Sequence, residues 1–224
     1  MQELNTKEAV SSTRICLSDF ILPQRYGAPA TVHRRFQKWR KDGVFRRILE
    51  VLADHLHREG RLDLSECFID GTFAPAKKGG SAVGPTKRGK GTKIMGMADA
   101  YGYPVAVCVE SASPGGVKLA VQTVRSRFTS ALPQRLIGDK AYDSNPLDAE
   151  MAAMGIRMIS PNRTGTRRTR DGRELRCYKR RWKVERLFSW LGFSRRLTAR
   201  YERYIENCEA FLHPASFFIL FKRL

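Results

Sequence analysis

Three acidic residues stand in positions where a carboxylate has a chemical use. Asp70 ends the short apolar run of ECFIDGTF, and Asp139 ends a second one in QRLIGDKAYDS. Glu185 is the one acid of YKRRWKVERLFSWL, a stretch that otherwise carries only positive charge. Three carboxylates that meet at the edge of a sheet can bind Mg²⁺, which takes oxygen ligands in near-octahedral geometry. Two such ions about 3.5–4 Å apart activate the attacking oxygen and stabilise the leaving oxygen of a phosphodiester displacement.

Each acid taken alone has a simpler explanation. Asp-Gly after a strand is a common turn, and GDKAYDS is also compatible with a turn. Glu185 follows Arg181 by four residues, so the two could form an ordinary helix ion pair that stabilises the helix only slightly. Glu185 also borders the apolar stripe of its helix, which consists of Val184, Leu187, Phe188 and Leu191. The combination of the three acids, rather than any one of them, favours a metal site.

The elements that must position these acids alternate between strands and helices. Apolar runs and turn signals predict strands over 66–73, 93–102, 103–111, 134–144 and 156–162, and helices over 113–128 and 145–155. This order predicts an α/β fold with a mixed β-sheet flanked by helices. Sites in open α/β sheets lie at the ends of central strands, so Asp70 and Asp139 are expected side by side. Residues 77–93 and 162–176, rich in glycine or arginine, are expected to be loops.

The first 60 residues form a small, basic helical region in this prediction. Apolar residues three and four apart indicate two amphipathic helices, which Asp42-Gly43 separates. Five basic residues are predicted on the outer side of the first helix: Arg34, Arg35, Lys38, Arg40 and Lys41. A DNA-contacting face and a solvated face are equally compatible with this pattern. We therefore divide the chain into an N-terminal region, 1–60, and a main domain, 61–224.

The charge of the chain indicates a polyanionic partner. Its 41 Lys and Arg against 22 Asp and Glu give a net charge of +19 in 224 residues. Solubility alone requires a net charge of only about 2–8, so a merely solvated basic surface explains this excess poorly. A membrane surface would require a basic amphipathic helix with a wide apolar face. Nucleic acid is therefore the expected partner.

The cysteines and the N-terminus indicate a reducing compartment. The chain has five cysteines, an odd number, and no CxxC pair, so neither a disulfide framework nor a zinc site is predicted. The opening residues lack the basic and apolar regions of a signal peptide, and no apolar run approaches the length of a membrane span. We expect a cytoplasmic, DNA-associated bacterial protein.

Together, FIDGTF, LIGDKAYDS and YKRRWKVERLFSWL resemble the first-Asp, second-Asp and Glu segments of DDE transposases, in particular the IS5-type bacterial insertion-sequence transposases. The resemblance covers about residues 25–224. It implies an RNase H-like catalytic domain whose catalytic residues and metal ligands are Asp70, Asp139 and Glu185. It also implies two Mg²⁺ ions, with Mn²⁺ as a possible substitute. In such enzymes water cleaves the element end, and the freed 3′-OH then attacks target DNA.

The resemblance also suggests how DNA is held. Tyr178, Arg181 and Glu185 satisfy the Tyr-x2-Arg-x3-Glu signature. The signature continues with a basic residue seven positions after the Glu, where this chain has Gly192; Arg195 and Arg196 are the candidates to replace it. Nine residues are predicted to contact DNA: Tyr178, Arg181, Lys140, Lys87, Arg88, Lys90, Lys93, Arg195 and Arg196.

The expected partner is double-stranded DNA, comprising terminal inverted repeats and target DNA, bound by a homo-oligomer. No membrane and no nucleotide cofactor are expected: Gly84-x4-Gly89-Lys90 resembles a P-loop, but Gly91 replaces the required Ser or Thr. Two alternatives stay open. One is a metal-dependent nuclease without strand transfer. The other is an impaired copy that only binds DNA, because family members carry a longer helical segment before RYGAP and because Pro214 falls inside the expected final helix.

Overall fold

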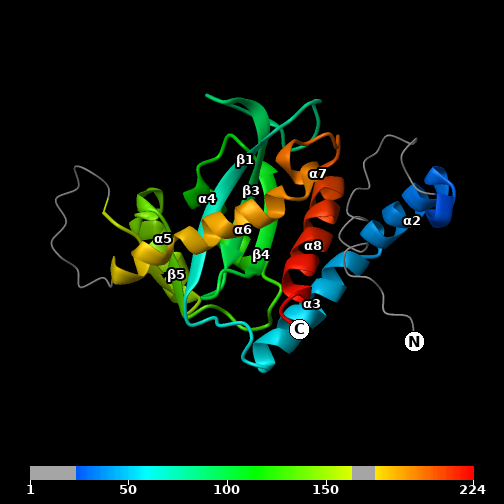
Figure 1. The fold of residues 1–224 in the computed structure, drawn as a ribbon. Helices are drawn as coiled ribbons and strands as arrows, with labels where there is room; N and C mark the ends of the chain where they lie inside the picture. The colour runs from blue at the N-terminus through cyan, green and yellow to red at the C-terminus, as the bar shows by residue number, and fades with distance from the viewer. Residues whose placement is uncertain (1–23, 163–174) are drawn as a thin grey trace.

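A mixed sheet forms the centre of the molecule, with helices on both of its faces (Figure 1). The computed structural model describes residues 24–162 and 175–224. The strands of the sheet are β1 (Cys67–Pro75), β2 (Gly84–Thr86), β3 (Gly89–Ala98), β4 (Pro104–Ser111), β5 (Arg135–Ile137) and β6 (Arg157–Ile159). The helices are η1 (Gln24–Tyr26), α2 (Pro29–Lys41), α3 (Val44–Arg58), α4 (Gly116–Arg125), η2 (Lys140–Tyr142), α5 (Asn145–Ala153), η3 (Leu175–Arg180), α6 (Trp182–Gly192), α7 (Arg195–Thr198) and α8 (Ile205–Phe221).

The sheet joins an antiparallel part to a parallel part. β4, β3 and β1 pair antiparallel, and the short β2 extends the pairing of β3 at its first residues. β1 then pairs parallel with β5, and β5 with β6. The chain passes through α4 between β4 and β5, and through α5 between β5 and β6. The predicted RNase H-like mixed sheet flanked by helices is therefore confirmed.

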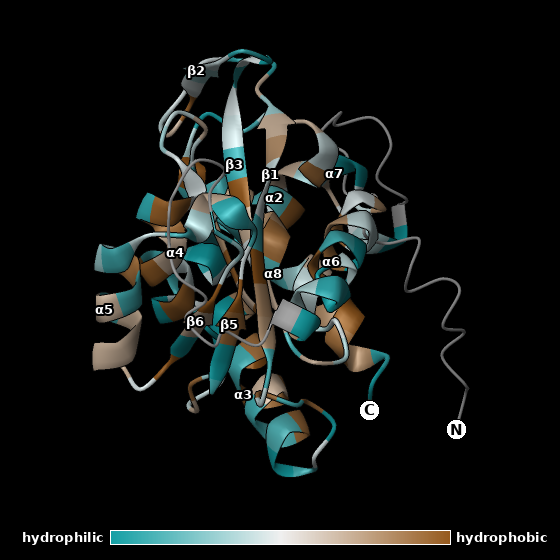
Figure 2. Ribbon diagram, turned by 90° about the vertical axis from the view of Figure 1, so that its left-hand side faces the viewer, coloured by the Kyte–Doolittle hydropathy of each residue, from teal (hydrophilic) through white to brown (hydrophobic). Residues whose placement is uncertain are grey.

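Two apolar cores fill the space between the sheet and its helix layers. Successive side chains of a strand point to opposite faces of the sheet. Phe68 accordingly belongs to the core under α3, α6 and α8, whereas Ile69 belongs to the core under α4 and α5. Figure 2 shows apolar residues along the central strands of the sheet. The face that carries Phe68 is the one that matters for the acids.

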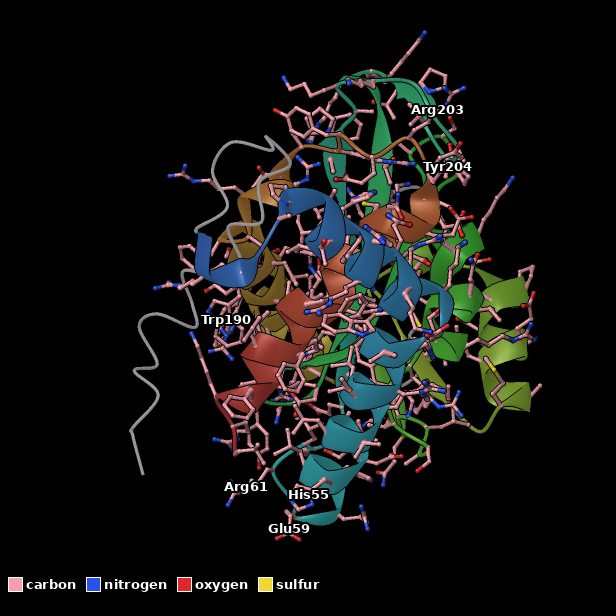
Figure 3. The ribbon with its side chains drawn as sticks, turned by 90° about the vertical axis from the view of Figure 1, so that its right-hand side faces the viewer. His55, Glu59, Arg61, Trp190, Arg203 and Tyr204 are labelled. Carbon is pink, nitrogen blue, oxygen red and sulfur yellow. The ribbon has the colours of Figure 1, made fainter. Side chains whose placement is uncertain are left out.

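The two N-terminal helices meet where the sequence predicts a break. Gly43 has a φ of +65°, a left-handed conformation that favours glycine, and it separates α2 from α3. α2 has no buried residue, whereas α3 inserts Leu49, Ala53 and Leu56 into the core that it shares with α8. Figure 3 shows α3 beside α8, with His55 near one end of the molecule. Residues 1–23 lie outside the described residues, and the division at residue 60 stays a prediction.

The prediction of a loop over 77–93 was wrong. The segment contains β2 and the first residues of β3, which form a hairpin. Gly89 has a φ of +103°, and the Thr86 hydroxyl donates to its carbonyl at 2.8 Å, which closes the turn. A Cβ on Gly91 would lie 2.4 Å from the Phe73 ring, so only glycine lets β3 pass here. Because a hairpin is not the strand–loop–helix of a P-loop, the resemblance to that motif is only one of sequence.

The final helix continues through its proline. α8 runs from Ile205 to Phe221 with Pro214 inside it, so Pro214 does not divide the helix in two. None of the described helices combines the length and the apolar composition needed to cross a membrane. The predicted Arg-rich loop falls mostly on residues 163–174, outside the described part of the chain.

Candidate active site

Strand pairing brings Asp70 and Asp139 to adjacent positions. Phe68 of β1 lies opposite Ile137 of β5 in parallel register. Each acid follows its member of this pair by two residues, so both acids are expected on the sheet face that carries Phe68 and Ile137. The cores place α6 over this same face. The register thus gives the predicted side-by-side arrangement, but β1 continues to Pro75, so the expectation that a strand ends on Asp70 was wrong.

Asp139 is held by its own short helix and by a buried tyrosine. Its Oδ1 accepts a hydrogen bond from the Ala141 backbone N–H at 2.9 Å, which caps η2. The ring of Tyr142, only 2% exposed, packs against the backbone just before the acid. A Cβ on Gly138 would lie 2.7 Å from this ring, so the absence of a side chain at Gly138 permits the turn that presents Asp139.

Glu185 reaches the same region from α6, which crosses the sheet in front of β1 in Figure 1. Val184 and Leu187 are fully buried and fix this helix on the sheet. Glu185 is the next residue after Val184 and is exposed, as expected for the margin of the apolar stripe. The packing of α6 thus sets the position from which the third acid projects.

Arg181 joins two of the three acids. Its Nη1 donates to Oδ2 of Asp70 at 2.5 Å, and its Nη2 donates to Oε1 of Glu185 at 2.7 Å. The Arg181 side chain is only 22% exposed, and its guanidinium lies 5.9 Å from the centre of the Tyr178 ring. One cation therefore bridges a strand acid and a helix acid.

The electrostatics of the acids agree with this geometry. Burial is the largest cause that raises the pKa of Asp70, and the negative charge of Asp139 adds to it; the Gly71 N–H and Arg181 act in the opposite direction. Burial also raises the pKa of Tyr142, with further contributions from the charges of Asp70 and Asp139. The two aspartates therefore lie close enough to repel each other, and Arg181 stabilises the ionised form of Asp70.

The donor set fits a hard divalent cation in its chemistry. Three carboxylates supply the oxygen ligands that Mg²⁺ prefers, and the guanidinium of Arg181 already occupies a place between Asp70 and Glu185 that a metal ion could take instead. Within residues 24–162 and 175–224, no three His, Cys, Asp or Glu side chains approach closely enough to form an assembled metal site. The structure thus brings Asp70 and Asp139 together and connects Glu185 to Asp70 through Arg181.

The predicted DNA contacts fall into two groups by distance. Lys140 is exposed directly after Asp139, and Tyr178 is half-buried beside Arg181, so these residues lie at the acids. Lys87, Arg88 and Lys90 are instead exposed on the β2–β3 hairpin. Asp70 lies opposite Gly96 of β3, six residues beyond Lys90, which corresponds to about 20 Å along the strand.

Three further predicted contacts have other environments. Lys93 lies opposite Phe73, so its side chain is on the other face of the sheet from Asp70. Its Nζ donates to the Pro114 carbonyl. Burial lowers the pKa of Lys93. Arg195 is exposed at the start of α7. Arg196 is ion-paired with the buried Glu202 at 2.7 Å, so its role in packing is already evident.

Two buried polar networks, one just before β1 and one at the base of the β2–β3 hairpin, were not anticipated. Glu66 accepts from Arg180 at 2.5 Å and from Arg135 at 3.2 Å, which fastens η3 to the strands just before α6 begins. Arg200 is 1% exposed and donates to Thr92 Oγ1 at 2.6 Å and to the Ser81 carbonyl at 2.5 Å. Nothing local in the sequence identifies either network, because the partners are distant along the chain.

Comparison with known proteins gives matches by sequence and by structure. The model of the transposase DDE domain matches residues 61–213. A putative transposase for insertion sequence element IS402 from Burkholderia cepacia is 32% identical over 137 residues, 57% of this chain. This chain spans 62% of that relative, and the IS5 subfamily is not resolved by the match.

Two solved structures resemble the chain weakly. A piggyBac transposase synaptic complex with hairpin DNA has a TM-score of 0.48 and 11% identity, over 71% of this chain and 47% of that one. The Mos1 strand transfer complex has a TM-score of 0.31 and 10% identity, over 96% of this chain and 75% of that one. The sequence matches, in contrast, cover most of the main domain. The chain belongs to the family of the transposase DDE domain, as a relative of bacterial insertion-sequence transposases.

Proposed function

We propose that this protein is a DNA transposase that cleaves the ends of an insertion sequence and joins them to target DNA. Asp70, Asp139 and Glu185 are its catalytic residues. The observation that carries the proposal is the register of β1 and β5, which sets two aspartates side by side under the helix that bears Glu185. Its partners are the terminal inverted repeats and target DNA, bound by a homo-oligomer.

The three carboxylates would hold the metal ions, two Mg²⁺ with Mn²⁺ as a substitute. When bound, such ions activate the attacking oxygen and stabilise the leaving oxygen of the phosphodiester. Asp70 lies within β1, and Asp139 follows β5 and caps η2, so their oxygens need little reorganisation. Glu185 stands on the first turn of α6, where the helix dipole favours a negative charge.

The basic residues would hold the phosphate backbone around this centre. Lys140 and Arg181 lie at the acids and suit phosphates next to the scissile bond. Lys87, Arg88 and Lys90 form an exposed basic tip about 20 Å away and suit phosphates further along the duplex. Tyr178 packs beside Arg181 and limits the positions that this guanidinium can adopt.

Cleavage of the inverted repeat by Glu185→Gln tests the proposal. We expect activity with Mg²⁺ or Mn²⁺ to fall more than about a hundredfold, because even residues that only orient metal ligands cost 10–100-fold when replaced. DNA binding, measured by fluorescence anisotropy, should be retained. The products are resolved on denaturing gels.

Glu50→Gln is the matched control. Glu50 pairs with Arg46 four residues earlier at 2.8 Å, the same helix spacing as Arg181 and Glu185, but on α3. It should cleave like the wild type. Equal activity of Glu185→Gln and Glu50→Gln would refute the catalytic role of Glu185. Cleavage without joined products would identify a nuclease, and DNA binding without cleavage would identify an impaired copy.

A further inference from the structure

The bridge made by Arg181 cannot coexist with a metal ion that uses the same oxygens. Oδ2 of Asp70 and Oε1 of Glu185 are both occupied by one guanidinium, at 2.5 and 2.7 Å. A divalent cation at these carboxylates must displace at least one of the two ion pairs, because a guanidinium and a metal ion repel each other at that distance. Arg181 is therefore a stand-in for the cation of the site.

If a metal ion displaces these ion pairs, the guanidinium of Arg181 is left beside the acids with an unpaired positive charge. Its side chain is 22% exposed, and it is held on one side by the Tyr178 ring, so it can turn only over a short range. A phosphate oxygen of bound DNA is the ligand that suits it, since guanidinium binds phosphate in a bidentate manner. The same side chain can then pair either with the carboxylates when they bind no metal ion, or with a phosphate of bound DNA.

We propose that Arg181 exchanges between these two partners and so couples metal binding to DNA binding. This inference rests on the proposed function. Without metal, Arg181 neutralises Asp70 and Glu185 and is withheld from DNA. With metal, it is released to the phosphate backbone. By thermodynamic linkage, DNA must raise the affinity for the metal by the same factor by which the metal raises the affinity for DNA.

The neighbouring basic residues of the described chain do not have this double role. Arg180 is paired with Glu66, and Lys183 donates to the Ala100 carbonyl. Arg186 lies between the rings of Trp182 and Trp190, at 4.8 and 4.7 Å. Among the described basic residues named here around the start of α6, only Arg181 contacts two of the proposed metal ligands. The exchange is therefore specific to one side chain.

The experiment measures Mn²⁺ binding by isothermal titration calorimetry, with and without a duplex carrying the inverted repeat. Gels run after each titration at 4 °C verify that the DNA is intact. In the wild type we expect DNA to raise Mn²⁺ affinity about tenfold, within the usual range of coupling between sites. In Arg181→Gln, Mn²⁺ should bind more tightly than to the wild type without DNA, and the gain from DNA should shrink to about twofold or less.

Two variants make the result specific. Arg186→Gln removes one charge from the same helix without touching the carboxylates, and it should behave as the wild type. Arg181→Lys keeps the charge but loses the fork that spans two carboxylates. It should bind Mn²⁺ more tightly than the wild type without DNA, and it provides the test if Arg181→Gln does not fold.

The outcomes separate the inference from the proposed function. If Arg181→Gln and Arg181→Lys bind Mn²⁺ like the wild type and keep the full coupling, the exchange is refuted while the metal site stands. If the wild type binds Mn²⁺ no better than Asp70→Asn, with DNA or without it, the metal site itself is refuted, and the exchange with it.

Discussion

At the scale of single residues, the site depends on a position, Gly138, that has no room for a side chain. Gly138 stands between β5 and Asp139, and the ring of Tyr142 fills the space that a side chain on Gly138 would take. The ring is buried, so it cannot move outward without opening the core under α4 and α5. The position of one proposed ligand is therefore set by a glycine and a tyrosine that bind nothing themselves.

Gly138→Ala tests this dependence. Its Cβ would lie 2.7 Å from the Tyr142 ring, and overpacking of this kind typically costs about 1–3 kcal/mol. We expect a lower free energy of unfolding in urea, and a larger loss of DNA cleavage than the loss of stability explains.

Gly115→Ala is the matched control for Gly138→Ala. Gly115 has a φ of −62°, and nothing lies within 4 Å of the Cβ that it would gain. It should leave both stability and cleavage nearly unchanged. A Gly138→Ala protein as stable and as active as the control would show that Tyr142 does not fix Asp139.

The residues also show what the sequence can and cannot predict. Asp70 and Asp139 were expected together, because apolar runs that end on acids are local signals. The contact between Arg181 and Asp70 joins residues 111 positions apart and depends on how α6 lies across the sheet. The sequence indicated only the local half of that bridge, the spacing of Arg181 and Glu185.

At the scale of elements, the basic hairpin is fastened by a buried arginine. Arg200 follows α7 and donates to the Ala82 and Ser81 carbonyls at the base of the hairpin, as well as to Thr92 on β3. Its own backbone N–H bonds to the Pro75 carbonyl at the end of β1. The sequence predicted a loop here, because β2 has only three residues and its anchor, Arg200, lies 108 positions from Thr92.

Arg200→Met should loosen the hairpin. The substitution removes one donor from the carbonyls of Ser81 and Ala82 and from the buried Thr92 hydroxyl, and an unsatisfied buried group costs about 1–3 kcal/mol. We expect a free energy of unfolding lower by about 3 kcal/mol or more, measured by urea denaturation. Hydrogen exchange at residues 81–92 should be faster.

Arg203→Met serves as the control, since the Arg203 side chain is exposed in the same segment. Figure 3 places it at the end of the molecule opposite His55. Its stability should stay within about 0.5 kcal/mol of the wild type, as is usual for surface changes. If Arg200→Met were equally mild, the buried guanidinium would not be the anchor of the hairpin.

At the scale of the whole molecule, the net charge of +19 includes two groups of basic residues, one at the acids and one at the hairpin tip, which the proposed function assigns to different parts of a duplex. About 20 Å separates Asp70 from Lys90, which corresponds to roughly six base pairs of B-DNA. In the proposed function, contacts at the tip would contribute affinity, whereas those at the acids would also set the position of the scissile bond. The two groups should therefore respond differently to substitution.

Replacement of Lys87, Arg88 and Lys90 by Gln tests this division. If all three side chains neutralise phosphates, the slope of log K against log salt should flatten by roughly 2.7, or about 0.9 per contact. The rate of cleavage at saturating DNA should change little, because the tip lies far from the acids. Anisotropy titrations between 50 and 200 mM salt give the slope.

Replacement of Lys38, Lys41 and Arg34 by Gln on α2 removes the same charge elsewhere on an exposed surface. A slope that flattens equally in both triple variants would mean that the hairpin tip has no special share in DNA binding. It would instead assign the salt dependence to the overall charge of the protein.

The parallel pairing of β1 with β5 has a consequence for folding. β1, β3 and β4 are joined by short connections and can pair early, whereas β5 must close a segment of dozens of residues before it meets β1. α6 is synthesised later still. The two aspartates and the glutamate can therefore meet only after β5 and α6 have been synthesised and packed on β1, so a partly synthesised chain carries basic surface without the proposed catalytic site.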